Sequence, residues 1–234
     1  MTRIISTNEN RKDIVYDAQC ALINTAAITE GFNIYDLTEF DRLKLMIALY
    51  QANMFQNKAK FVCEECGEEN TYTIDFNNVL IRLNSFNLEK QKFEYENKNF
   101  KYEFIIRYPS VKLVKKFHES YCKIHNKRVP NRERKTDESI QNLEYINLFI
   151  EKISYTNKQT GKTTVIDFND YLVSDIEDIM CIFPQDVLYS DNGVIKFIVT
   201  NMIQPINDAF DKHECWKCGT IHEKGNINQT ETFF

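Results

Sequence analysis

Cys63-Glu64-Glu65-Cys66-Gly67 is a C-x2-C pair followed by glycine, and Cys215-Trp216-Lys217-Cys218-Gly219 repeats the pattern near the other end of the chain. We call residues 63–67 the first knuckle and residues 215–219 the second knuckle. Each supplies two thiolates, half of a tetrahedral four-sulfur shell for Zn²⁺. The glycine suits a tight turn, because it adopts a positive φ at little cost and lets backbone amides point at the sulfurs. We expect the knuckles to meet around one zinc ion and to form a zinc ribbon.

The four predicted ligands are Cys63, Cys66, Cys215 and Cys218. A closed shell of four thiolates leaves no position for water or substrate, so such a zinc site is structural rather than catalytic. Zinc ribbons commonly separate their cysteine pairs by about 15–20 residues. Here residues 67–214 lie between the pairs, so the zinc ion would act as a clasp for the whole fold.

Two other interpretations of the second knuckle stay open. His213 and His222 flank Cys215 and Cys218 and could complete a local shell, which would leave the first knuckle unused. A C-x-x-C pair can also be a redox dithiol, although this pair has a twin and no clear βαβ context. The other three of the seven cysteines are expected to be small core side chains outside disulfides: Cys20, Cys122 and Cys181.

The composition is typical of a folded protein. Among 234 residues, 43% are hydrophobic and 13% are aromatic, which suffices for a sizeable core. No apolar run approaches the roughly 18–20 residues of a membrane span, and the N-terminus lacks a signal-peptide pattern, so we expect a soluble, unexported protein. Phosphate-binding loops, nucleophile elbows and H-E-x-x-H motifs are absent from the sequence. We therefore expect a protein that is not an enzyme.

Positive charge gathers in residues 112–135, which we call the basic segment. It holds nine lysines and arginines and two glutamates, a net charge of +7, whereas the net charge of the whole chain is −5. The segment is a solvated surface, a docking site for an acidic protein, or a nucleic-acid site. The acidic remainder and the scarcity of interleaved aromatic residues disfavour nucleic acid. The candidate partner-binding residues are Lys112, Lys115, Lys116, Lys127, Arg128, Arg132, Arg134 and Lys135.

Several helices are expected. Apolar residues recur at helical spacing over 13–29, with Gly31 as a stop signal. Thr38 and the acidic residues after it predict a capped helix that runs to about Phe55. Further helices are predicted at 110–125, 136–153, 168–183 and 193–203, the last two ended by Pro184 and Pro205.

Strands are expected between these helices. A hairpin over 58–76 would present the first knuckle, and another hairpin is predicted over 155–166. Period-two alternation predicts further strands over 79–83 and 93–108. Helices and antiparallel strands mix without βαβ repetition, so the fold class is α+β. The expected segments are an N-terminal helical segment 1–57, a zinc-ribbon subdomain 58–76 plus 206–234, and a central α+β body 77–205.

The order of these motifs resembles the baseplate hub assembly proteins of T-even-type contractile-tailed phages. The resemblance covers residues 37–234 and ends in an aromatic pair, Phe233-Phe234. It is carried by Leu37-Thr38-x-x-Asp41-Arg42-x-x-Leu45, Phe61-Val62-Cys63-x-x-Cys66-Gly67, Tyr72-Thr73-Ile74-Asp75-Phe76-Asn77-Asn78-Val79, Arg107-Tyr108-Pro109-Ser110 and Cys215-x-x-Cys218-Gly219. The chain departs from the pattern at 123–135 and in lacking a Cys-Pro knuckle.

The resemblance implies a virus-encoded structural or assembly protein that works through contacts with other tail and baseplate hub proteins. It would be located in the tail baseplate of the virion or, during assembly, in the host cytoplasm, with no membrane or small-molecule partner. The alternative class is a nucleic-acid-binding zinc-ribbon accessory factor, which would bind with a steep salt dependence.

Overall fold

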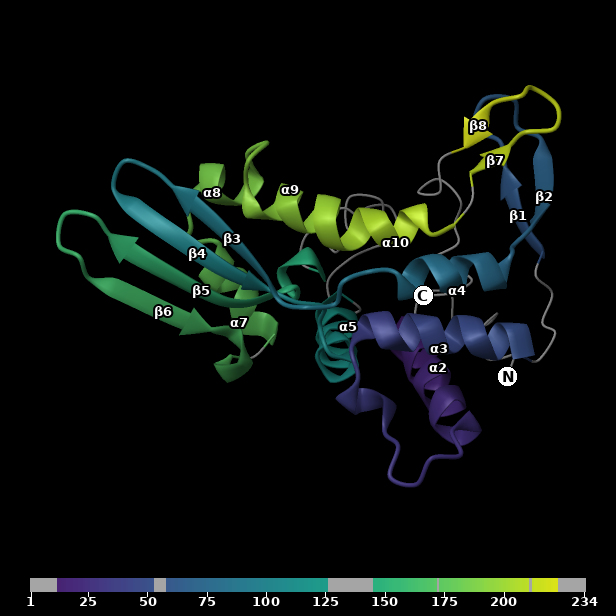
Figure 1. Cartoon of the computed structure of the whole chain (residues 1–234), viewed down its shortest axis with the longest axis horizontal. Coiled ribbons are helices and arrows are strands. Elements are labelled where there is room, and N and C mark those ends of the chain that lie inside the picture. The colour runs from purple at the N-terminus through teal and green to yellow at the C-terminus, as the bar shows by residue number, and fades with distance from the viewer. Residues whose placement is uncertain (1–11, 53–57, 126–144, 172, 211, 223–234) are drawn as a thin grey trace. The chain divides into compact units, whose positions relative to one another are not determined.

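The computed structural model describes residues 12–52, 58–125, 145–171, 173–210 and 212–222 (Figure 1). The chain divides into two compact units: the first unit is Met1–Asn87 with Ile203–Phe234, and the second unit is Leu88–Met202. The first unit combines the N-terminal helices with both knuckles. Within the described ranges, no helix has the length and apolar character needed to cross a bilayer.

The first unit is built from helices and two short hairpins. Its elements are α2 (Lys12–Ala26), η1 (Ile34–Asp36), α3 (Glu39–Ala52), β1 (Lys58–Val62), β2 (Glu69–Thr73), α4 (Phe76–Asn84), α10 (Gln204–Asp208), β7 (His213–Glu214) and β8 (Ile221–His222). The cap predicted at Thr38 is confirmed: its hydroxyl accepts from the Asp41 amide at 3.1 Å and donates to the Asp41 carboxylate at 2.7 Å. The buried side chains of α3 include Phe40, Leu43 and Ile47.

A buried polar cluster joins α2 to α3, and it was not predicted from the sequence. Arg42 is fully buried, and its Nε lies 2.9 Å and 3.0 Å from the two carboxylate oxygens of Glu39. Arg42 Nη1 donates to Gln19 Oε1 at 2.7 Å, and the Tyr16 hydroxyl donates to Glu39. Burial, followed by the Glu39 charge, raises the pKa of Tyr16 and keeps it a donor. The cluster thus satisfies its charges and hydrogen bonds internally.

Helix α4 corrects the strand predicted over 79–83. The Asp75 carboxylate caps the helix by accepting from the Asn78 amide at 3.1 Å. Val79 and Leu83, four residues apart, are buried, while Ile81 between them is 70% exposed. A strand would have placed all three side chains on one face, whereas a helix separates Ile81 from the other two.

The second unit is an antiparallel sheet with helices. Its strands are β3 (Gln91–Glu96), β4 (Phe100–Ile106), β5 (Ile150–Asn157) and β6 (Thr163–Asp167), which pair in that order. Its helices are α5 (Val111–His125), η2 (Phe168–Asp170), α7 (Val173–Met180), α8 (Gln185–Tyr189) and α9 (Val194–Ile198). Alternate residues of β4, Tyr102, Phe104 and Ile106, face a core that includes Phe183. The hairpin predicted over 155–166 is confirmed, with Gly161 at φ +68° in its turn.

Three boundaries in and beside the second unit differ from the prediction. The strand predicted over 93–108 is two strands, β3 and β4, joined by a turn. The helix predicted over 136–153 is wrong at its end, because Ile150 and Ile153 lie in β5 and pair with Ile106 and Phe104 of β4; residues 136–144 lie outside the described ranges. The helix predicted over 168–183 is divided into η2 and α7.

The predicted helix end before Pro205 is also wrong. Helix α9 is followed by a π-helical segment, Val199–Ile203, and then by α10, so helical backbone continues through the proline. Pro205 lies in the first turn of α10. A missing amide is tolerated there, and the change from α to π helix supplies the local adjustment that a proline requires.

Candidate metal centre

Two antiparallel hairpins present the knuckles (Figure 1). The first knuckle joins β1 to β2, whose register runs from the Lys58–Thr73 pair to the Val62–Glu69 pair. The second knuckle joins β7 to β8, in which His213 pairs with His222. Residues 63–66 and 215–218 thus lie at the turn ends of two hairpins of one unit.

The two knuckles have the same backbone geometry. In each, the amide of the first cysteine donates to the carbonyl of the residue five positions later at 2.9 Å. The glycine amide donates back to the carbonyl of that cysteine at 2.8 Å in the first knuckle and 2.9 Å in the second. Gly67 and Gly219 have φ values of +71° and +72°. This left-handed conformation explains the glycine after each pair, because other residues adopt it at a cost.

The four predicted cysteines converge. The sulfur atoms of Cys63, Cys66, Cys215 and Cys218 all lie within 4.8 Å of one another. Contacts of 3.6 Å join Cys63 to Cys218 and Cys66 to Cys215, so each knuckle contacts the other. A disulfide needs about 2.05 Å between sulfurs, and these cysteines are free thiols. The prediction that the two remote pairs meet is confirmed.

The spacing of the sulfurs fits one tetrahedral metal ion. A Zn–S bond of about 2.3 Å implies about 3.8 Å between sulfurs, since a tetrahedron's edge is about 1.6 times its centre-to-vertex distance. The two contacts of 3.6 Å and the upper limit of 4.8 Å bracket that value. Four soft thiolates in this arrangement suit a metal that accepts tetrahedral sulfur coordination.

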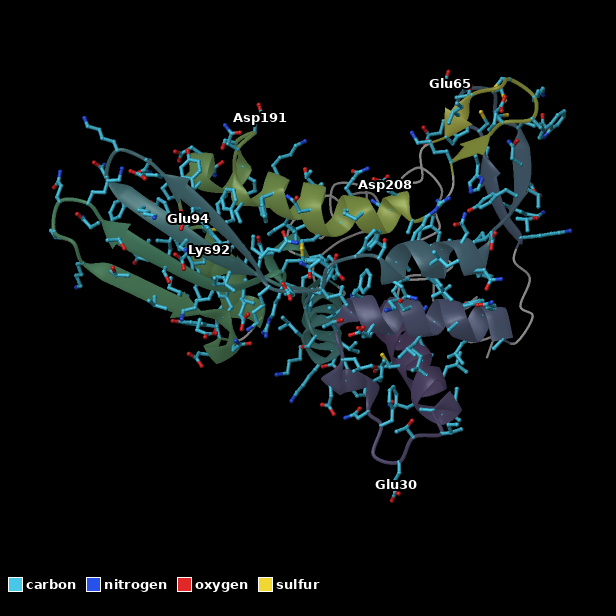
Figure 2. All side chains as sticks on the ribbon, viewed as in Figure 1. Glu30, Glu65, Lys92, Glu94, Asp191 and Asp208 are labelled. Carbon is cyan, nitrogen blue, oxygen red and sulfur yellow. The ribbon has the colours of Figure 1, made fainter. Side chains whose placement is uncertain are left out.

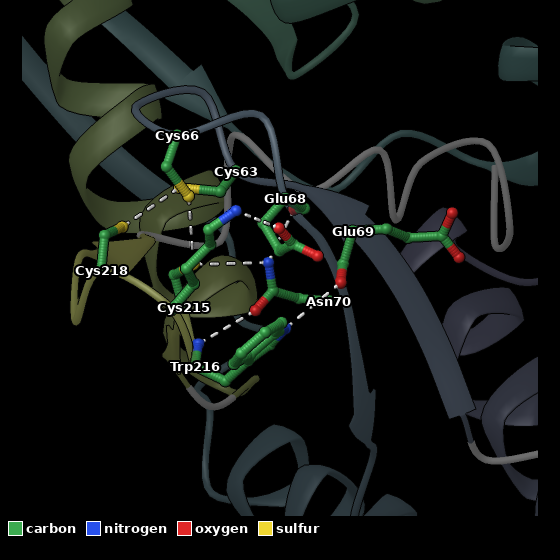
Figure 3. A network of polar contacts seen from close by, with 9 residues as sticks. Cys63, Cys66, Glu68, Glu69, Asn70, Cys215, Trp216 and Cys218 are labelled. Carbon is green, nitrogen blue, oxygen red and sulfur yellow. Dashed lines mark hydrogen bonds and ion pairs between the residues drawn. The ribbon is translucent and has the colours of Figure 1, made fainter.

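Asn70 connects the two knuckles (Figure 3). It is 3% exposed, and its Nδ2 donates to the Glu68 carbonyl at 2.8 Å and lies 3.5 Å from Cys215 Sγ. Its Oδ1 accepts from the Trp216 amide at 3.0 Å. One buried side chain therefore holds the end of the first knuckle, the start of the second and one candidate ligand in register.

Two further side chains contact the sulfurs. His222, 5% exposed, places its Nε2 3.1 Å from Cys63 Sγ, and Thr220 Oγ1 lies 3.1 Å from Cys218 Sγ. His213 stacks on Tyr72 with ring centroids 3.4 Å apart. The local shell of two histidines and two cysteines is therefore not formed among the described residues, where the candidate ligand group is the four cysteines.

The surroundings give the thiols of the cluster different pKa values. The pKa of Cys215 falls to about 6. Desolvation raises this pKa, but hydrogen bonds from the amides of Cys218 and Lys217 and from the Asn70 side chain lower it by a larger amount. The pKa of Cys66 rises to about 12: the Glu68 amide lowers it, but desolvation and the neighbouring thiols together raise it by more. Four sulfurs so close together cannot all ionise without a cation to balance them.

Cross-knuckle contacts extend to the surface. Lys217 Nζ lies 2.6 Å from the Glu68 carboxylate, and Trp216 Nε1 donates to the Glu69 carbonyl at 3.4 Å. Lys60 pairs with the Glu69 carboxylate at 2.5 Å. The sequence pattern did not single out these residues or Asn70, because their contacts form only when the two knuckles meet.

The basic segment is described only in part. On α5, Lys112 and Lys116 are exposed, and Lys115 lies 3.8 Å from Glu119. The remaining candidates lie outside the described residues: Lys127, Arg128, Arg132, Arg134 and Lys135. The prediction that this segment binds a partner stays a prediction.

Comparison with known proteins adds no relative. No family model, no curated protein and no solved structure matches the chain.

Proposed function

We propose that the chain binds one structural Zn²⁺ through Cys63, Cys66, Cys215 and Cys218, and that the two hairpins form a zinc ribbon. The observation that carries this proposal is the convergence of four thiols at tetrahedral spacing from two knuckles with the same backbone geometry. Zinc is favoured because it takes four cysteine ligands in a closed tetrahedron and needs no redox partner. The 3.6 Å contacts between knuckles favour a shared ion over a redox dithiol confined to Cys215 and Cys218.

Metal content tests the zinc proposal directly. The full chain, purified from zinc-supplemented cells, is analysed by native mass spectrometry and elemental analysis, with one zinc per chain expected. Cys66→Ser should lose the ion, whereas Cys181→Ser, which changes an exposed cysteine outside the cluster, should retain it. A folded wild-type chain without stoichiometric metal, or with a disulfide between Cys215 and Cys218, would refute the proposal.

We further propose that the protein is a non-enzymatic component or assembly factor of a contractile-tail baseplate hub, and that its partners are other tail proteins. The support is the ordered set of motifs from the capped helix at Thr38 through both knuckles. A closed four-thiolate shell is consistent with this role, because it presents no open coordination position for chemistry. The site of action would be the virion baseplate or the host cytoplasm during tail assembly.

Co-expression tests the tail assignment. The tagged full chain is produced with the hub and baseplate proteins of a contractile-tailed phage, and complexes are isolated by size-exclusion chromatography and identified by mass spectrometry. The expected result is a stoichiometric complex with a hub protein that survives a second column. Recovery of the chain alone from every combination would contradict the assignment while leaving the zinc proposal intact.

A further inference from the structure

The second knuckle displays the only tryptophan of the chain to solvent. Trp216 is 69% exposed, although the backbone that carries it is held by a 3.0 Å hydrogen bond from its amide to buried Asn70. Its indole Nε1 donates to the Glu69 carbonyl at 3.4 Å, which sets the direction of the ring (Figure 3). A large aromatic side chain held in one orientation loses little conformational entropy when it binds a partner.

A second apolar side chain accompanies it. Val62, the last residue of β1, is 62% exposed and pairs across the hairpin with Glu69, the residue whose carbonyl the indole contacts. The exposed aromatic group therefore lies on the second knuckle and the exposed aliphatic group on the facing hairpin, and Glu69 is a partner of both residues. Tryptophan is among the residues that most often dominate protein–protein binding energy.

The surroundings of this pair are acidic. Residues 58–73 and 213–222, which form the two hairpins, contain five glutamates and three lysines, a net charge of −2. Four thiolates and one Zn²⁺ would add −2 to this value. Glu64 and Glu65 are exposed on the first knuckle, and Figure 2 labels Glu65. Glu68 and Glu69 contact Lys217 and Lys60. Such a field repels nucleic-acid phosphates and attracts lysine and arginine side chains.

We propose that Trp216 and Val62, together with Glu64 and Glu65 of the first knuckle, form a docking surface for a partner protein segment that presents both apolar side chains and lysine or arginine. The apolar pair supplies the contact area, and the glutamates select the positive partner and speed its association. The inference rests on the proposed role as a binding protein, but it does not require that the partner be a tail component.

A random peptide library tests this surface, because it requires no assumption about the identity of the partner. The zinc-loaded full chain is the bait, and Trp216→Ser is the counter-selection bait. Enriched peptides should combine basic and apolar residues. Synthetic copies should bind the wild type at least about tenfold more tightly than Trp216→Ser, the order of a single hot-spot residue. Trp216→Phe should restore part of the affinity.

Matched variants separate the two contributions. The double change Glu64→Gln and Glu65→Gln should weaken binding severalfold and reduce its salt dependence. Ile28→Ser, which removes an exposed apolar side chain elsewhere in the first unit, should leave affinity unchanged. Zinc stoichiometry of each variant shows whether the knuckles remain formed.

Several results would overturn the inference: no enriched peptide, enriched acidic peptides, or equal binding to Trp216→Ser. Trp216-dependent binding of a single-stranded oligonucleotide would assign the surface to nucleic acid instead. Trp216-dependent self-association in sedimentation would assign it to a second copy. Each of these outcomes is distinct from loss of zinc or from failure to join a hub complex, which test the proposed function.

Discussion

The free energy of unfolding of the first unit should increase linearly with the logarithm of the free zinc concentration. Cys66 and Cys215 are 149 residues apart in sequence. Closing a loop of that length in an unfolded chain costs about 5 kcal/mol at 25 °C, or a factor of several thousand in affinity. The unfolded chain therefore offers two separate two-thiolate sites, whereas the folded chain offers one four-thiolate site. Zinc should bind the folded state far more tightly.

The expected slope follows from linkage. When one ion binds only the folded state, each tenfold increase in free zinc above the dissociation constant adds about 1.4 kcal/mol to the free energy of unfolding. Urea titrations in metal buffers of stepped free zinc measure this quantity. The fluorescence of Trp216 is the appropriate signal, since it is the sole tryptophan and lies on the second knuckle.

Two variants serve as controls for the measurement. Cys66→Ser should give a flat line, because three thiolates bind zinc much more weakly, and Cys181→Ser should reproduce the wild-type slope. A wild-type free energy of unfolding that does not change with free zinc would refute the metal bridge. A slope near twice the expected value would show that two ions bind per chain, one at each knuckle, and would refute a shared shell.

Three further predictions concern the surroundings of the site and the two cores. Asn70→Asp should lower zinc affinity about 10–100-fold in chelator competition by placing a carboxylate beside a thiolate, whereas unchanged affinity would remove Asn70 from the site's support. Glu39→Gln should lower the unfolding free energy in urea by about 3–5 kcal/mol by leaving Arg42 buried without its counter-charge, and a cost below about 1 kcal/mol would contradict this account of the cluster. Burial raises the pKa of Tyr108 to about 12 from an ordinary value of 10. The neutral Tyr108 therefore stabilises the folded state fully below pH 10, and this stabilisation is lost as the pH rises towards 12. Tyr108→Phe should abolish that part of the loss of folding stability at alkaline pH, measured by circular dichroism.

Local chemistry made part of the fold predictable. The knuckles are recognisable by residue type and spacing, and Thr38 marks a helix start because the cap needs only groups within three residues. The same holds for the turn at Gly161. These features depend on neighbours in sequence, so a single chain displays them whatever its tertiary contacts are.

Other elements are decided by caps and contacts that the spacing of apolar residues does not reveal. Residues 79–83 alternate like a strand, yet the Asp75 cap and the burial of Val79 with Leu83 make them helical. Ile150 and Ile153 fit a helical stripe, but pairing with β4 places them in a sheet. Pairing with β4 overrides the helical pattern at Ile150 and Ile153, whereas at residues 79–83 the local Asp75 cap outweighs the apparent alternation. Asn70 could not be predicted for a related reason, since its partner Cys215 lies 145 residues away.

The division of the chain changes what the metal is expected to hold. Residues 67–214 suggested a clasp around the whole fold, but the inserted second unit has its own four-stranded sheet and apolar core. The hairpin β7–β8 has only two residues in each strand. Isolated two-stranded hairpins are marginal in water, and a bound metal can supply the missing stability. Zinc should therefore govern the ribbon and the joining of the two separate segments of the first unit, while the continuous segment Leu88–Met202 folds around its own core.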